Sequence, residues 1–137
     1  MPVDGPVEGP DGLSDAELRF LRSTFDHARE GNVDRLLEKL DAGVPADLTN
    51  GTGDTLLILA AYHRQPDAVR ALLGRGADHA RVNDRGQTAL AAAAFRQDAE
   101  IVSELLCAGA DPHLGPRSAV AVATFFDLPE MLSLLRS

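Results

Sequence analysis

The apolar residues of this chain are grouped in short blocks at helical spacing, and turns rich in glycine separate the blocks. Thr55 is a typical N-cap residue, and the apolar positions behind it lie three and four residues apart, which predicts a short helix. A second block of the same spacing ends at Gly76, where a glycine in the left-handed backbone conformation is expected to end a second helix. The two stripes consist of Leu57, Ala60 and Ala61, and of Ala68, Val69, Leu72 and Leu73.

This pair of predicted helices is repeated along the sequence. Residues 53–78 align without a gap with residues 86–111, so that Thr55 falls on Thr88 at an offset of 33 positions. Toward the carboxyl end the offset shrinks to 30, because the last connecting loop lacks three residues. We therefore predict an all-α repeat solenoid of about four helix-turn-helix units, the last with a shortened loop. The predicted units span residues 14–47, 48–80, 81–113 and 114–137.

The repeated frame resembles the ankyrin repeat, a 33-residue unit of a β-turn and two helices. G-x-T-x-L-x-x-A-A followed by L-L-x-x-G-A-D occurs in full in 53–78 and 86–111, and the resemblance covers roughly residues 14–135. The tetrapeptides TLLI and TALA lack the proline and histidine of the family's T-P-L-H. The resemblance, to small bacterial ankyrin proteins, implies units joined by β-turn loops, and a protein-binding concave face formed by turn tips and first helices.

Stacking must stabilise these units, because helices of about ten residues are not stable alone in water. A buried leucine contributes roughly 1.5–3 kcal/mol, and its truncation leaves a cavity as well. We therefore expect Leu73→Ala or Leu106→Ala to lower the stability by about 2–5 kcal/mol.

The two ends of the stack differ from the middle. Ser14 and Glu17 form a capping-box pattern, which predicts a long first helix over residues 15–29. Residues 1–13, rich in proline, glycine and acidic residues, are predicted to be a disordered tail. The expected core residues of the first helix are Phe20, Leu21 and Phe25.

The last unit carries apolar residues at three positions that are polar one repeat earlier. Two interpretations remain open. Either the shortened loop tilts the last helices so that these side chains fold inward, or they form an exposed patch for self-association or for a partner. The candidate patch consists of these three residues, Phe126, Leu128 and Leu134, together with Met131.

Composition narrows the class of partner. The net charge of −8 argues against a general affinity for nucleic acid or for anionic membranes, and it favours a neutral or basic protein. Residues 1–54 hold 12 acidic and 5 basic residues, so the amino-terminal end is expected to be the acidic one. The single Cys107 cannot form an internal disulfide, and neither a secretory signal nor a membrane-spanning stretch is recognisable, so we expect a cytoplasmic protein.

The sequence contains no pattern typical of catalysis or metal binding. Its four histidines lack the spacing of metal ligands, and Cys107 has no recognisable histidine partner, so we predict no cofactor, no metal and no enzymatic activity. The segment 51–53, Gly-Thr-Gly, lacks the lysine and the spacing of a phosphate-binding loop and is interpreted as a turn. The histidines are His27, His63, His79 and His113.

Three classes of function remain. The leading hypothesis is a non-enzymatic adaptor or regulator, a monomer or weak homodimer that binds a protein through the concave face. The second is a homo-oligomeric structural or stability factor that associates through the apolar last repeat, and the third is a small-molecule or catalytic groove. The expected partner-binding residues are Thr52, Asp54, Tyr62, His63, Asp84, Arg85, Gln87, Phe95 and Arg96.

Overall fold

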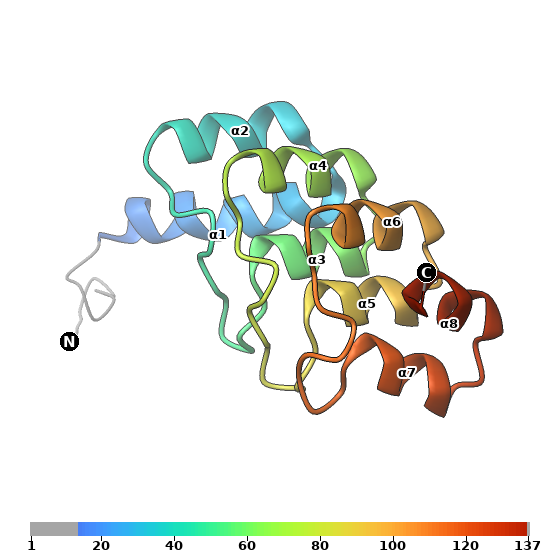
Figure 1. Ribbon diagram of the computed structural model, residues 1–137. Coiled ribbons are helices and arrows are strands. Elements are labelled where there is room, and N and C mark those ends of the chain that lie inside the picture. Colours follow the sequence, from blue (N-terminus) through green and yellow to red (C-terminus); the bar gives the residue numbers. More distant parts are fainter. Residues whose placement is uncertain (1–13, 137) are drawn as a thin grey trace.

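The computed structural model describes residues 14–136, which form four helical hairpins stacked side by side (Figure 1). This confirms the predicted all-α repeat solenoid, while the predicted disordered tail, residues 1–13, lies outside the described residues. In the described part no β-strand forms, and Thr49 and Thr55 make only an isolated antiparallel bridge. The helices are α1 (Asp15–Glu30), α2 (Val33–Asp41), α3 (Leu56–Tyr62), α4 (Pro66–Gly74), α5 (Ala89–Phe95), α6 (Ala99–Cys107), α7 (Ala119–Phe125) and α8 (Pro129–Arg136).

The hairpins form two layers. The first helices α1, α3, α5 and α7 contact one another in that order, and the second helices α2, α4, α6 and α8 pack beside them in the same order (Figure 1). The loops between hairpins also touch, because the Asp84 N–H donates to the Thr52 carbonyl and the Arg117 N–H donates to the Gly86 carbonyl, each at 3.0 Å. Each loop is thus held in register by the next.

The predicted N-caps are confirmed. The Thr55 hydroxyl accepts the Ile58 N–H at 3.1 Å, and the Thr88 hydroxyl accepts the Ala91 N–H at 3.2 Å. At the first helix, Ser14 accepts the N–H of Glu17 and donates its own N–H to the Glu17 carboxylate, which completes the capping box. Helix α1 ends at Glu30, one residue later than predicted.

The first helices of the middle repeats are buried on all sides. Every residue of 56–61 and 89–94 is buried, and the alanines in these segments allow neighbouring helices to approach closely. In the second helices Leu72 and Leu105 are fully buried, whereas Leu73 and Leu106 are only half-buried against the core. The large loss of stability on substitution by alanine is therefore expected for Leu72 and Leu105, and not for their neighbours Leu73 and Leu106.

The first helix buries fewer of its apolar residues than expected. Phe25 is buried and Leu21 is half-buried, but Phe20 is 40% exposed and its ring lies 3.6 Å from the Lys39 ammonium. The expectation that Phe20 is a core residue is wrong. Helix α1 has a first-helix neighbour on one side only, α3, so part of its apolar surface remains uncovered.

The last repeat divides the candidate apolar patch. Met131 is 4% exposed, and Leu128 and Leu134 are half-buried against the core, because α8 packs on α6 and α7. The inclusion of Met131 in an exposed patch is therefore wrong. The side chain of Met131 folds inward, as the other interpretation expected. Phe126 is 50% exposed, and its neighbour Phe125 is 82% exposed.

Each hairpin turns through one residue with a positive φ angle. This residue is a glycine only in the first hairpin, where Gly31 has φ +73°. In the other three the chain places a side chain in the left-handed conformation, which costs about 1–2 kcal/mol in residues other than glycine. These residues are Arg64, Gln97 and Asp127, with φ of +59°, +56° and +54°.

Gln97→Gly is therefore expected to raise the free energy of unfolding by about 1 kcal/mol, because glycine adopts a positive φ without steric cost. Gln97 is exposed, so little packing is lost. Ala108→Gly is the control, since Ala108 is exposed with φ −80° at the C-cap of α6, where glycine relieves no positive φ and should not raise the stability. Urea denaturation measures both, and a loss of stability in Gln97→Gly would contradict the prediction.

A candidate partner-binding groove

A groove of about 930 Å³ lies between the loops and the first helices. The ends of the first helices form one wall, and the loops that precede these helices form the other. Six of the nine expected partner-binding residues line it, namely Asp54, Tyr62, His63, Arg85, Gln87 and Phe95. The remaining lining residues are Arg29, Asn50, Leu59, Pro116, Arg117, Ala121, Val122, Phe125 and Phe126.

Four aromatic side chains form a continuous row along the helical wall. The rings of Tyr62 and Phe95 are parallel to within 7° with centroids 6.2 Å apart. Phe126 follows at 5.4 Å from Phe95, and Phe125 at 4.9 Å from Phe126, both edge to face. We call Tyr62, Phe95, Phe126 and Phe125 the aromatic row. It joins the expected groove residues to the exposed part of the last repeat.

The repeat accounts for three of the four residues in this row. Tyr62, Phe95 and Phe125 are each the last residue of a first helix, at offsets of 33 and 30, so stacking of the repeats places them in line. Arg29 occupies the same position in the first repeat and lines the groove beyond Tyr62. The sequence analysis did not assign Phe125 to the site, although the offset that aligned it with Phe95 could have done so.

Arg96 supports the row from outside the groove lining. Its guanidinium donates to the Tyr62 carbonyl at 2.6 Å, and its Cζ lies 5.0 Å from the centre of the Tyr62 ring. This cation–π contact fixes the guanidinium against Tyr62. Arg96, which was expected among the partner-binding residues, thus supports Tyr62 and does not itself line the groove.

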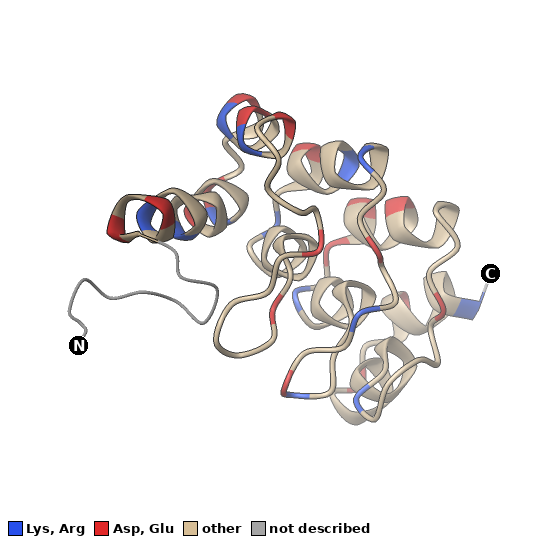
Figure 2. Ribbon diagram, turned by 90° about the vertical axis from the view of Figure 1, so that its left-hand side faces the viewer, with Lys and Arg blue, Asp and Glu red and all other residues tan. Residues whose placement is uncertain are grey.

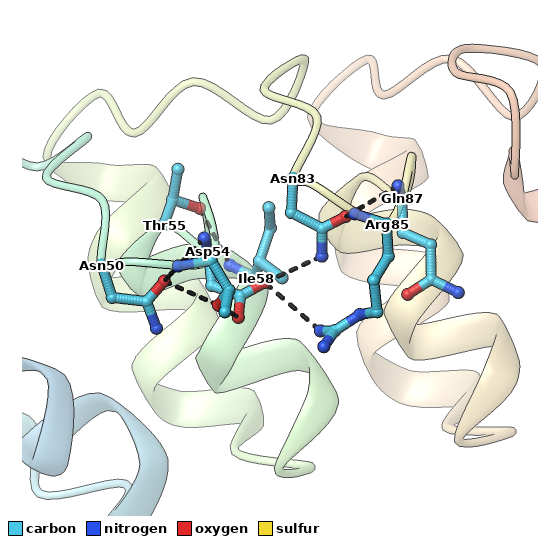
Figure 3. Close-up of polar contacts among 8 residues, drawn as sticks. Asn50, Asp54, Thr55, Ile58, Asn83, Arg85 and Gln87 are labelled. Carbon is cyan, nitrogen blue, oxygen red and sulfur yellow. Dashed lines mark hydrogen bonds and ion pairs between the residues drawn. The ribbon is translucent and has the colours of Figure 1, made fainter.

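On the loop wall, Asp54 is the acceptor at the centre of a polar network (Figure 3). It is 5% exposed and accepts hydrogen bonds from the Thr52 hydroxyl at 2.8 Å and from Asn83 Nδ2 at 2.8 Å. The Arg85 guanidinium approaches the same carboxylate at 3.4 Å. Asp54 thus ties its own loop to the next one, and little of it is accessible to a partner.

Two asparagines that the sequence analysis missed shape the loops. Asn50 Oδ1 accepts the N–H groups of Thr52 at 3.0 Å and Asp54 at 2.9 Å. Asn83, at the equivalent position of the next repeat, accepts the N–H groups of Arg85 at 3.0 Å and Gln87 at 2.9 Å. A side-chain amide that closes a turn in this way is a usual role of asparagine. The two asparagines hold the loop wall in shape.

The other two expected residues, Thr52 and Asp84, do not line the groove. The Thr52 hydroxyl is bonded to Asn50 and Asp54 within its own loop. Asp84 is exposed and packs close to Gly53, where a Cβ atom would lie 2.7 Å from the Asp84 carboxylate. The structure therefore brings Thr52 and Asp84 together at the loop tips, outside the groove.

The groove is lined by more positive than negative groups. Its lining contains three arginines, Arg29, Arg85 and Arg117, and one carboxylate, that of Asp54. Beside the aromatic row, the pKa of His63 is lowered, mainly by burial and further by repulsion from Arg29 and Arg96, while Asp54 acts in the opposite direction. Because the unfolded chain binds the His63 proton more tightly, His63 contributes less stability as the pH falls below about 6.5.

Arg29→Gln is expected to raise the pKa of His63, because it removes a positive charge that disfavours the imidazolium form. The measurement is a pH titration of the His63 ring signals by nuclear magnetic resonance. Arg19→Gln removes the same charge from the exposed first half of α1 and should leave the pKa of His63 unchanged. A lower pKa in Arg29→Gln would contradict the prediction.

Within residues 14–136 the structure gathers no group of three His, Cys, Asp or Glu side chains that could hold a metal ion. Cys107 is exposed at the end of α6. His79 does not line the groove, and its Nε2 lies 3.1 Å from the Ala108 carbonyl. None of the helices in the described part is long and apolar enough to cross a membrane.

Comparison with known proteins adds two findings. Residues 25–115 match the sequence model of a family described as ankyrin repeats (3 copies). The chain is also 49% identical over 51 residues to a Pseudomonas aeruginosa protein whose name describes it as an ankyrin repeat protein. That alignment covers 37% of this chain and 30% of the relative, so the chain spans less than a third of the relative's length.

Proposed function

Because this chain belongs to the ankyrin repeat family, we propose that it is a non-enzymatic adaptor or regulator that binds a protein partner through the groove. Ankyrin repeats generally mediate protein–protein interaction. We further propose a cytoplasmic location, which fits the single exposed cysteine.

The aromatic row carries this proposal. Tyrosine and arginine are enriched among the residues that dominate binding energy, and large rigid rings supply contact area at little cost in conformational entropy. In this groove Tyr62 and Phe95 are stacked, and Arg85 lies on the opposite wall. Phe95 and Phe126 remain 39% and 50% exposed, so apolar surface is available for a partner to cover.

The test is a pull-down from a lysate of the native host with three immobilised proteins. These are the wild type, the groove variant Tyr62→Ala/Phe95→Ala and the outer-face control Arg70→Ala/Glu100→Ala. The control residues lie on α4 and α6, where they form a surface ion pair at 2.9 Å. We expect a partner that the wild type and the control retain and the groove variant loses. Equal recovery on all three proteins would refute binding through the groove.

Self-association is a second candidate function, which the 82% exposure of Phe125 favours. A face-to-face contact of two last repeats would cover Phe125 and Phe126. Light scattering of the wild type and of Phe125→Ser distinguishes this function from the first. A dimer mass that becomes monomeric in Phe125→Ser would support self-association, and equal monomer masses would remove it.

A basic partner, which the net charge of −8 favours, would meet the outer surface of the stack. Acidic residues occur on α1, α2 and the outer helices α4 and α6, with basic residues among them on α1, α2 and α4 (Figure 2). The groove has the opposite sign, so the overall charge does not describe the segment that enters it.

A further inference from the structure

The groove is a positively charged region on a negatively charged chain. Of the charged residues that line it, three are arginines and one is a carboxylate, whereas the whole chain has a net charge of −8. The carboxylate, Asp54, is 5% exposed and its oxygens are occupied by Thr52, Asn83 and Arg85. A ligand in the groove therefore meets mainly guanidinium groups.

The three arginines differ in how far a nearby carboxylate neutralises their positive charge. Arg29 forms an ion pair with Asp26 at 2.7 Å. Arg85 uses one nitrogen on Asp54 at 3.4 Å and is about half exposed, so the rest of its guanidinium can bind another acceptor. Arg117 is exposed and pairs with no carboxylate within residues 14–136. The strongest uncompensated positive charge is thus on the loop wall.

The two walls have different chemistry. Arg85 and Arg117 come from adjacent loops, joined by the Arg117 N–H and the Gly86 carbonyl at 3.0 Å. The helical wall presents the aromatic row. An extended peptide directs successive side chains to opposite sides, and its alternate residues are about 7 Å apart. A segment that alternates acidic and apolar residues would satisfy both walls at once.

We propose that the groove binds an extended acidic segment of the partner protein, with carboxylates on Arg85 and Arg117 and apolar side chains on the aromatic row. This inference rests on the proposed function and specifies the chemistry of the partner. Guanidinium–carboxylate contacts are strong and directional, and the aromatic row excludes water beside them.

Single-stranded nucleic acid also combines negative charge with flat rings, but the surroundings of the groove favour a peptide. A strand longer than the groove would bring further phosphates close to a chain whose net charge is −8, and this charge repels them. A peptide carries its charge only on chosen residues and can be neutral beyond the groove. Binding of an oligonucleotide is therefore an outcome of the test that would overturn the proposal.

The experiment measures fluorescence anisotropy with the full chain and labelled octapeptides of alternating sequence. The probe peptide alternates glutamate and leucine, and the three comparison peptides alternate glutamine and leucine, lysine and leucine, or glutamate and serine. An octathymidylate is the nucleic-acid arm. We expect the glutamate–leucine peptide to bind about tenfold more tightly than every other probe. Each comparison peptide removes one of the two interactions, and the oligonucleotide carries further phosphates that the net charge of the chain repels. Equal or tighter binding of any other probe, or no binding at all, overturns the proposal.

Matched variants test whether the peptide binds in the groove. Arg117→Gln and Arg85→Gln should each weaken binding of the glutamate–leucine peptide by about tenfold, because each removes a charged hydrogen-bond donor. Arg19→Gln removes the same charge from the exposed part of α1 and should leave the affinity unchanged. Equal affinity in all variants counts against the proposal.

The pull-down separates the two possible failures. If Tyr62→Ala/Phe95→Ala loses a partner while Arg117→Gln keeps it and the peptide panel shows no preference for acid, the groove binds a partner of other chemistry. If all variants retain the same proteins, the proposed function fails as well.

Discussion

Leu105→Ala is expected to lower the free energy of unfolding by about 2–5 kcal/mol, because it removes a fully buried side chain and leaves a cavity. Helix α6, which carries Leu105, packs against α4, α5 and α8, so the cavity lies between successive repeats. The loss should therefore weaken the contacts that hold neighbouring hairpins together. Urea denaturation followed by circular dichroism measures the change in unfolding midpoint.

Leu106→Ala is the matched control, since it makes the same change one residue later. Leu106 is only partly buried against the core, so its truncation should cost less than that of Leu105, about 1–2 kcal/mol. Equal losses for the two variants would contradict the assignment of Leu105 to the core. The equivalent pair Leu72 and Leu73 should behave in the same way, with Leu72 the more costly to truncate.

The sequence predicted the hairpins because an alignment of the chain with itself at the repeat offset identifies equivalent positions. Such an alignment needs no information on packing. It predicted the caps at Thr55 and Thr88 because capping depends on neighbouring residues only. It could not decide which leucine of each Leu-Leu pair is buried. Adjacent positions on a helix point about 100° apart, and both lie within a wide apolar stripe. Only the direction of the neighbouring helices decides between them.

The ends of the stack were the least predictable part, because a terminal repeat has one neighbour instead of two. Phe20 has an apolar side chain at a helical position, but it remains 40% exposed, with Lys39 of α2 over its ring. Met131 occupies the last hairpin and is nevertheless buried, because α8 turns it toward the core. Apolar character alone does not tell which side of a terminal helix is covered.

The groove was predicted in outline but its charge was not. The repeat offset and the family resemblance together indicated that loops and first helices form one surface, and six of nine expected residues do line it. The count of charges gave −8 for the chain and suggested a basic partner. A count does not tell which face carries each charge. Arg29, Arg85 and Arg117 are separated in sequence, and only the stacking of all four repeats brings them to one groove.

The hydrogen-bond network around Asp54 leads to the second large expected effect. Asp54→Ala should lower the free energy of unfolding by about 1–3 kcal/mol, because Asn83 Nδ2 loses its acceptor in a buried site and the Thr52 hydroxyl loses one of two. The Arg85 guanidinium also loses its only carboxylate in the described part of the chain. The contact between the two loops should weaken together with the stability.

Asp84→Ala is the control for Asp54→Ala, because it removes the same carboxylate from an exposed position on the neighbouring loop. An exposed carboxylate that closes no buried network should change the stability by less than about 0.5 kcal/mol. Urea denaturation of both variants gives the comparison, and hydrogen exchange of the Asp84 and Arg85 amides reports the loops separately. Faster exchange of these amides in Asp54→Ala is expected. Equal stability of the two variants would mean that the Asp54 network does not hold the loops, and that the loop wall of the groove is maintained by the backbone hydrogen bonds and the asparagines alone.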